Sequence, residues 1–219
     1  AFDISNEAFP FMACSEITVC GGLRARLFRI SFSGELAFEI AVPTRYGDAL
    51  MRRLMVAGEE FDVVPYGTEA LGVMRIEKGH AAGNELNGTT SAQNLGMGRM
   101  VSKNKDSIGS TLSEREGLNQ PDMLMFVGFK PVDSNAKITA GANLMAKDAV
   151  ANAANDQGYI TSAAYSPYLG SSIGIGFLKN GGDRKGEIIR AVSPLTGTDI
   201  QIEVVSAHFI DPEGERPRA

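Results

Sequence analysis

Hydrophobic and polar positions alternate most clearly at residues 29–42, RISFSGELAFEIAV. Every second residue after Ser33-Gly34 is apolar, whereas Glu35 and Glu39 lie at the positions between. Successive side chains of a strand point to opposite faces, so this run predicts a strand with one apolar face and one face that carries two carboxylates. The residues before Ser33-Gly34 alternate in the same way. The whole stretch therefore predicts two antiparallel strands joined by a tight Ser-Gly turn.

Two later stretches have the three- and four-residue apolar spacing of helices. The first is expected at 44–58, because Tyr46, Leu50 and Leu54 share one stripe and a glycine follows. The second is expected at about 69–78, with Thr68 as its N-cap and a glycine after its last residue. Both helices follow the alternating stretch, so the first half of the chain predicts mixed α and β structure.

The second half of the chain has a different pattern. Residues 84–105, rich in Gly, Asn and Thr, predict a loop and then a short strand near 97–101, and a short connecting helix is expected at 107–117. Beyond Pro121, short runs rich in β-branched and aromatic residues predict an antiparallel barrel or sandwich. These runs are 123–130, 158–164, 173–178, 187–192 and 200–210, and the segment 139–157 is expected to be a loop.

Composition excludes several classes of function. The 219 residues carry a net charge of −5 without a basic cluster, which argues against a nucleic-acid-binding surface. No apolar run approaches the roughly 18 residues that a membrane-spanning helix needs. Cys14 and Cys20 are interpreted as reduced intracellular thiols rather than a disulfide. His80 and His208 are far apart in sequence, so no metal site is expected.

Three motifs, in this order and at this spacing, resemble the aminomethyltransferase family. They are RISFSGELAFEI, VPYGTEALGVMRIEKGH and YITSAAYSPYLGSSIGIGFLKNG. The family contains the glycine-cleavage T-protein and the folate domains of enzymes that oxidise sarcosine and dimethylglycine. Within it, the wording is most similar to the C-terminal part of the alpha subunit of heterotetrameric sarcosine oxidase, since T-proteins typically have a YTGE-type turn where this chain has FSGE.

The resemblance implies an α+β fold, in which a partial aminomethyltransferase-type folate-binding domain is followed by a small antiparallel β-barrel domain. It places the C-terminal half of the folate domain at 1–106, a connecting helix and linker at 107–122, the barrel at 123–211 and a tail at 212–219. The first half of the folate domain, with the family's essential aspartate, is expected to lie outside this chain. No catalytic residue is therefore assigned here.

By their positions in the motifs, Glu35 and Arg75 are implied to contact folate. An ionised carboxylate can accept the adjacent N–H donors of a pterin's aminopyrimidinone edge, and a guanidinium suits a folate carboxylate or ring carbonyl. The residues alone allow simpler interpretations. Glu35 and Glu39 can lie on the solvated face of an ordinary hairpin, and Arg75 can be a surface arginine paired with Glu69 or Glu77.

The resemblance also implies a reaction and its participants. Sarcosine would be oxidised at a flavin in another subunit, and the imine would react in this domain with tetrahydrofolate to give 5,10-methylenetetrahydrofolate and glycine. FAD, FMN and NAD would be bound elsewhere in a hetero-oligomeric, cytoplasmic complex, without nucleic acid or membrane partners. Two alternatives stay open: a T-protein-like aminomethyltransferase of the glycine cleavage system, and a non-catalytic assembly module.

Overall fold

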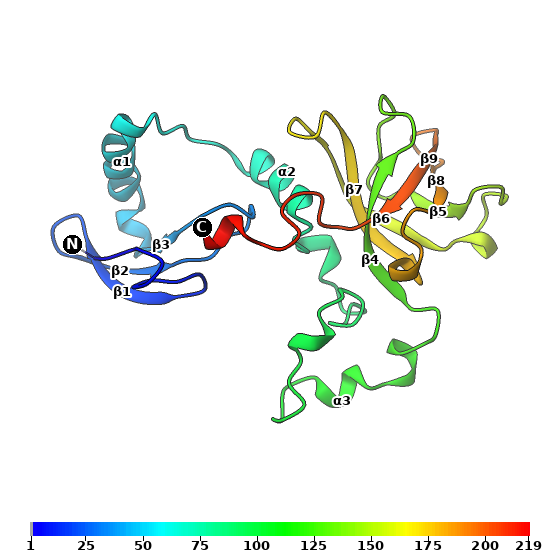
Figure 1. Cartoon of the computed structure of the whole chain (residues 1–219), viewed down its shortest axis with the longest axis horizontal. Helices are drawn as coiled ribbons and strands as arrows, with labels where there is room; N and C mark the ends of the chain where they lie inside the picture. The colour runs from blue at the N-terminus through cyan, green and yellow to red at the C-terminus, as the bar shows by residue number, and fades with distance from the viewer. Residues whose placement is uncertain (1) are drawn as a thin grey trace. The chain divides into compact units, whose positions relative to one another are not determined.

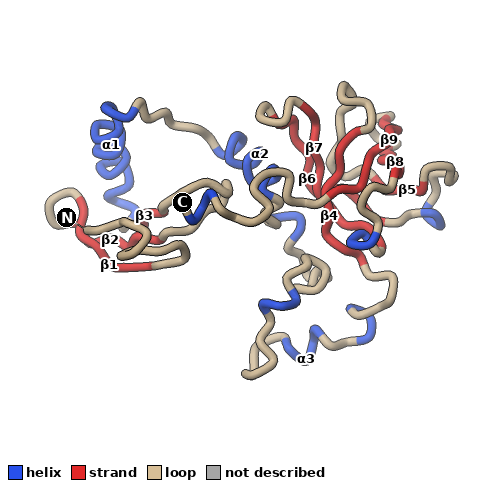
Figure 2. Tube along the Cα trace, in the orientation of Figure 1, coloured by secondary structure: helices blue, strands red, loops and turns tan. Residues whose placement is uncertain are grey.

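The computed structural model describes residues 2–219, which divide into two compact units (Figure 1). The first unit contains the residues up to Gly72 together with Asp211–Ala219. The second unit is Val73–Ile210. Each unit has a sheet of its own: three strands in the first and a closed barrel in the second (Figure 2). The expected α+β class with an antiparallel barrel is confirmed.

The first unit is built on the antiparallel sheet β1-β2-β3. Its strands are β1 (Cys14–Val19), β2 (Leu23–Phe28) and β3 (Glu39–Ala41). Burial alternates along β2, where Ala25 and Leu27 are buried while the arginines beside them are exposed. The sheet therefore has one face against the core of the unit and one face in solvent.

The expected hairpin is only partly correct. β2 and β3 do pair, with Phe28 opposite Glu39, but residues 29–38 between them form an irregular loop instead of two long strands and a tight turn. The backbone of Arg29 bonds to Met12 and Ala13, and the Gly34 N–H donates to the Ser31 hydroxyl. The Arg29 bonds continue the pairing of β2 with the residues before β1. The Gly34 bond is local, since a side-chain acceptor nearby offers the backbone an alternative to the ladder.

The first expected helix is present as a turn of 3-10 helix, Thr44–Tyr46, followed by α1 (Gly47–Gly58). Leu50 is the buried residue of α1, in agreement with the expected stripe. A second 3-10 turn, Glu59–Phe61, follows. The second expected helix is α2 (Thr68–Lys78), which ends at Gly79 with φ of +72°, a conformation that glycine adopts without strain.

The segment between α2 and the barrel is mostly irregular. It contains three 3-10 turns, Gly83–Glu85, Gly98–Met100 and Glu116–Leu118, and the short helix α3 (Ser110–Ser113). The strand expected near 97–101 is wrong, since a 3-10 turn lies there. The connecting helix expected at 107–117 is reduced to α3 and the turn after it.

Six antiparallel strands close the barrel in the order β4-β7-β6-β5-β8-β9. They are β4 (Leu124–Pro131), β5 (Asn143–Ala146), β6 (Gly158–Ser166), β7 (Ser171–Lys179), β8 (Ile188–Ser193) and β9 (Thr198–Val205). β5 lies inside 139–157, so the loop expected there is wrong at these four residues. β9 ends before Ile210, because the amides of Phe209 and Ile210 donate to the Glu77 carbonyl of α2.

The barrel encloses the main hydrophobic core. Its fully buried side chains come from every strand and include Phe129, Leu144, Ile160, Leu178, Ile189 and Ile202. Closure also depends on Gly176 of β7, because a Cβ at this position would overlap the backbone of Tyr159 and Ile160 on β6. Large aliphatic side chains inside and a glycine where β6 and β7 approach closely together account for a small, tightly closed barrel.

Candidate functional site

Glu35 lies in the loop between β2 and β3 of the first unit. Its side chain is 51% exposed, and its Oε1 accepts a hydrogen bond from Arg216 Nη1 at 2.7 Å. The preceding Gly34 is buried and has φ of +88°, so the chain reverses sharply just before the glutamate. Because a carboxylate has about four acceptor positions, the bond to Arg216 leaves capacity for further donors.

Arg216 belongs to the C-terminal strap, our name for Asp211–Ala219, which is part of the first unit. The Asp211 carboxylate accepts the backbone N–H groups of Glu215 at 2.9 Å and Arg216 at 3.2 Å. Pro217 is buried, and the Arg218 guanidinium lies over the Phe11 ring, 5.3 Å from its centroid. These contacts fix the backbone on both sides of Arg216.

Arg29 holds the last residue of the strap. It is 2% exposed and donates from Nη1 to the Phe9 carbonyl at 2.9 Å and from Nη2 to the Ala219 carbonyl at 2.7 Å. The ring of Phe38 lies 5.8 Å from its guanidinium carbon. Burying a guanidinium costs free energy unless its donors are satisfied, and these carbonyls satisfy two of its nitrogens.

Arg75 lies on α2, in the part of the helix that belongs to the second unit. Its Nη1 donates to Glu85 Oε2 at 2.9 Å, and its Nη2 donates to the Ser162 hydroxyl at 2.6 Å. The side chain is only 14% exposed. The interpretation as a surface arginine paired with Glu69 or Glu77 is therefore wrong, since its partner is the buried Glu85.

Glu85 completes a closed triangle with Arg75 and Ser162. The Ser162 hydroxyl donates to Glu85 Oε1 at 2.7 Å, and the Ala82 N–H donates to Glu85 Oε2 at 3.0 Å. Burial opposes ionisation of this carboxyl, but the hydroxyls of Thr161 and Ser162, the Ala82 N–H and the Arg75 charge together hold its pKa below the ordinary value. The pair is thus a charged clamp between the end of α2 and strand β6.

Glu39 and Glu77, two further glutamates of the motifs, differ in their surroundings. Glu39 is exposed on β3. Glu77 is buried, and its Oε1 accepts a hydrogen bond from the Ser166 hydroxyl of β6 at 2.5 Å. Glu77 therefore fastens α2 to the barrel.

The structure thus groups Glu35 with Arg216 in the first unit and Arg75 with Glu85 and Ser162 in the second. Sequence reasoning missed the three partners. Arg216 lies in a segment that was expected to be a tail, and Glu85 lies in a Gly- and Asn-rich loop without periodicity. From sequence, a glutamate among turn residues is expected to be exposed to solvent. Only the fold shows that Glu85 is buried.

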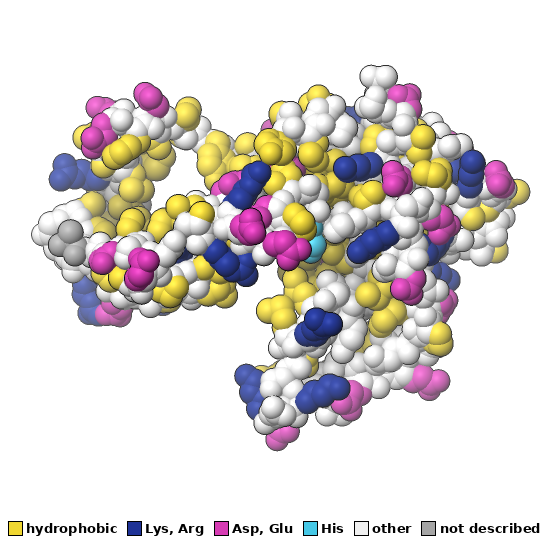
Figure 3. Space-filling model, in the orientation of Figure 1, with side chains coloured by type: hydrophobic (Ala, Val, Ile, Leu, Met, Phe, Trp, Pro, Cys, Tyr) yellow, Lys and Arg dark blue, Asp and Glu magenta, His cyan; other side chains and the backbone are white. Residues whose placement is uncertain are grey.

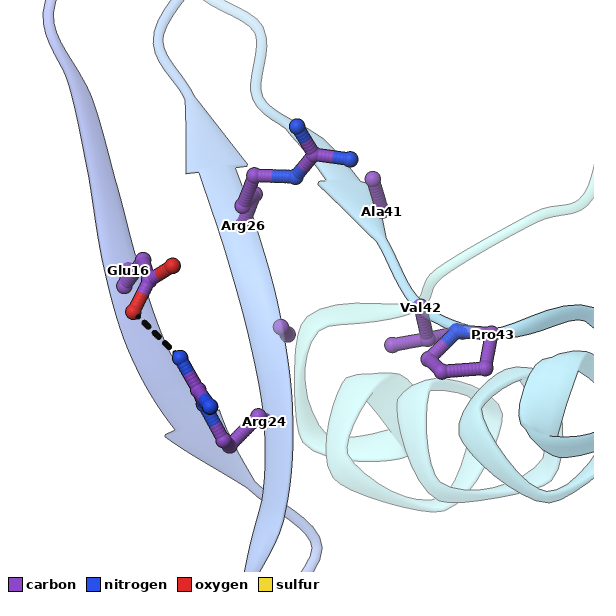
Figure 4. A pocket seen from close by; sticks show the side chains of 7 residues that line it. Glu16, Arg24, Arg26, Ala41, Val42 and Pro43 are labelled. Atoms are coloured by element: carbon purple, nitrogen blue, oxygen red, sulfur yellow. Dashed lines mark hydrogen bonds and ion pairs between the residues drawn. The ribbon is translucent and has the colours of Figure 1, made fainter.

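The surface hollows lined by described residues of the first unit include the following two. One lies over the solvent face of the sheet and is lined by polar and apolar side chains (Figure 4), with an ion pair between Arg24 and Glu16 at 2.8 Å. The other lies beside α1, lined by Ile40, Leu50 and Leu54 among others. Apolar side chains gather on this helix (Figure 3), and three of them are about half exposed: Met51, Leu54 and Val56.

Residues 2–219 contain no group of three or more His, Cys, Asp or Glu side chains that could hold a metal ion. Among the helices within the described residues, none has the length and apolar character required to cross a bilayer. Cys14 and Cys20 are exposed free thiols.

Comparison with known protein families finds a match in each half of the chain. Residues 1–105 match the GCVT N-terminal domain, and residues 125–211 match the glycine cleavage T-protein C-terminal barrel domain. The chain belongs to the aminomethyltransferase family. The crystal structure of glycine cleavage system aminomethyltransferase T from Bartonella henselae has the same fold, with a TM-score of 0.71 and 24% identity over 94% of this chain and 54% of that one.

Within the aminomethyltransferase family, the chain is similar to subunits of an oxidoreductase. It is 46% identical over 216 residues to sarcosine oxidase subunit alpha of Rhizobium meliloti (strain 1021), a match that covers 98% of this chain. It is 42% identical over 219 residues to the same subunit of Corynebacterium sp. (strain U-96), covering 99% of this chain. In both cases the chain spans only 22% of the length of the relative.

Proposed function

We propose that this chain is the tetrahydrofolate-binding part of a sarcosine oxidase alpha subunit, within a longer polypeptide. The observation that supports this most strongly is the 46% identity across nearly the whole chain to such a subunit, against 28% to the aminomethyltransferase of Chloroherpeton thalassium. In this proposal the imine formed by flavin-dependent oxidation of sarcosine reacts with tetrahydrofolate, giving methylenetetrahydrofolate and glycine. FAD, FMN and NAD are bound elsewhere in the complex.

Glu35 is the proposed contact of the pterin. An ionised carboxylate that accepts two adjacent N–H donors makes a paired, charge-assisted interaction, stronger than single neutral hydrogen bonds. The side chain of Glu35 suits this role because it is half exposed and its bond to Arg216 uses one oxygen. In this proposal Glu39, exposed on β3, does not contact the pterin. It therefore serves as the control for substitutions of Glu35.

Arg75 is the second proposed contact. Nη1 donates to Glu85 and to the His80 carbonyl, and Nη2 donates one of its two hydrogens to Ser162. A folate oxygen is therefore proposed to bind the Nε–H or the second hydrogen of Nη2. Glu85 neutralises the charge of Arg75 in a buried ion pair. This neutralisation favours a ring carbonyl of folate over one of its carboxylates as the group that Arg75 binds.

The contribution of this chain to the reaction is binding and orientation. Tetrahydrofolate supplies the nitrogen atoms that accept the one-carbon unit. Residues of the chain hold the pterin in one place, which makes the encounter with the imine effectively intramolecular. A protected site also keeps the imine from hydrolysis in water, which would release formaldehyde.

The test is product analysis in the complete enzyme. With sarcosine and tetrahydrofolate, the wild-type enzyme is expected to give methylenetetrahydrofolate, whereas Glu35→Gln is expected to oxidise sarcosine at an unchanged rate and to release formaldehyde. Glu39→Gln is the matched control and should give the wild-type products. Methylenetetrahydrofolate formation that is insensitive to Glu35→Gln would overturn the assignment. Aminomethyl transfer from a lipoyl carrier, without sarcosine oxidation, would instead support the T-protein-like alternative.

A further inference from the structure

We propose that Arg216 is a positioning residue for Glu35, so that the C-terminal strap prepares the carboxylate for the pterin. The inference rests on the proposed role of Glu35 and adds a residue from the far end of the chain. Its basis is the hydrogen bond from Arg216 Nη1 to Glu35 Oε1 at 2.7 Å, which joins positions 181 residues apart.

The glutamate needs such a partner because of where it lies. Residues 29–38 are a loop, and the Glu35 side chain is half exposed. A glutamate side chain in this situation samples several rotamers. A ligand that fixes one of them binds less tightly, because the side chain loses conformational entropy. An arginine that already holds one carboxylate oxygen removes part of this cost before the ligand arrives.

The strap is able to position the glutamate because it is itself fixed. Asp211 accepts the N–H of Arg216, Pro217 is buried, and Arg29 binds the carbonyl of Ala219. The Arg218 guanidinium lies over the Phe11 ring. None of these contacts involves Glu35, so the location of Arg216 is set independently of the side chain that it positions.

The hydrogen bond from Arg216 also leaves the Glu35 carboxylate able to accept hydrogen bonds from a ligand. Arg216 occupies one acceptor position of Oε1, and the remaining positions of both oxygens suffice for two N–H donors of a pterin edge. An exposed ion pair of this kind is weak, so it orients the carboxylate without holding it against a ligand. We therefore expect Arg216 to stay in place when folate binds, and its removal to weaken binding.

The experiment is a double-mutant cycle in the complete enzyme, with titration of folinic acid, a stable reduced folate, as the readout. Arg216→Gln is expected to raise the Kd about three- to tenfold, and Arg216→Lys, which keeps the charge, to restore part of the affinity. In a Glu35→Gln background, Arg216→Gln should have no further effect, because the residue acts through Glu35. Arg24→Gln removes an exposed ion pair of the same unit and is the matched control, expected to leave the Kd unchanged.

The outcomes separate this inference from the proposed function. An unchanged or lower Kd for Arg216→Gln, while Glu35→Gln still weakens binding, refutes the positioning role and leaves the function intact. Additive effects of the two substitutions also refute it, because Arg216 would then act on folate independently of Glu35. If Glu35→Gln itself leaves the Kd unchanged, the proposed folate site fails.

Discussion

Glu85→Gln is the most informative test of the second unit. The substitution keeps the size of a side chain that is 0% exposed, but it removes the charge opposite Arg75 and puts an amide nitrogen among groups that donate. An amide nitrogen at the Oε2 position faces two donors, the Arg75 guanidinium and the Ala82 N–H, and at the Oε1 position it requires the Ser162 hydroxyl to change from donor to acceptor. Breaking a buried pair by removing one partner costs about 3–5 kcal/mol, and we expect Glu85→Gln in this range because the carboxylate that it replaces is fully buried.

The assay is urea unfolding of the chain at pH 7, followed by circular dichroism. Glu85→Gln is expected to lower the free energy of unfolding by about 3–5 kcal/mol, whereas the control Asp122→Asn is expected to change it by less than about 1 kcal/mol. Asp122 pairs with Lys179 at 3.6 Å, and both side chains are about half exposed. A loss below about 1 kcal/mol for Glu85→Gln would contradict the charged clamp.

The pH dependence of the same difference gives an independent check. Folding lowers the pKa of Glu85, so its stabilising contribution is fully present above the ordinary glutamate pKa of about 4.3 and is lost as the pH falls through the lower pKa of the folded state. The stability difference between wild type and Glu85→Gln should therefore shrink as the pH is lowered from 7 into the acid range. A difference that grows on acidification would show that Glu85 is neutral in the fold.

Three further outcomes are expected. In the complete enzyme, Glu35→Gln should weaken binding of folinic acid about 10- to 150-fold and more than Glu39→Gln does, as measured by calorimetry; the reverse order would refute the role of Glu35. Residues 1–219 alone should bind the same ligand weakly or not at all, and micromolar affinity of a monomer would contradict this expectation. Gly176→Ala should destabilise the barrel by more than about 1 kcal/mol in urea unfolding, since the new methyl group overlaps the backbone of β6, and an unchanged midpoint would argue against so close an approach.

Regular periodicity predicted the elements that bury a continuous apolar stripe or face. The helix stripe through Leu50 and five of the six barrel strands follow from such patterns. The exception is β5, whose four residues are too few to show an alternating pattern. These residues form a strand because they pair with β8. The hairpin at 29–42 is present only in part for a different reason: its alternation is regular, but the β2–β3 ladder stops at Phe28 and Glu39, and the Gly34 N–H bonds locally to the Ser31 hydroxyl.

The candidate residues were found by their place in motifs, and their partners could not be found in that way. Arg75 and Glu35 lie in recognisable sequence motifs. Their partners Glu85 and Arg216 are chosen by long-range packing, since a charged residue in a loop has no periodicity that reveals its burial or its neighbour. The contact of Glu35 with folate stays a prediction that the Glu35→Gln titration addresses, and the contact of Arg75 with folate stays a prediction as well.

The path of the chain has a consequence for its synthesis on the ribosome. The first unit is discontinuous: it includes the residues up to Gly72 and the strap Asp211–Ala219, and the whole barrel unit lies between them in sequence. A ribosome therefore delivers all of Val73–Ile210 before the residues that bind Arg29 and Glu35 emerge. The barrel can close as soon as β9 is available, whereas the first unit waits for the last nine residues of this chain. A nascent chain that stops shortly after β9 is expected to carry a folded barrel beside a protease-sensitive first unit.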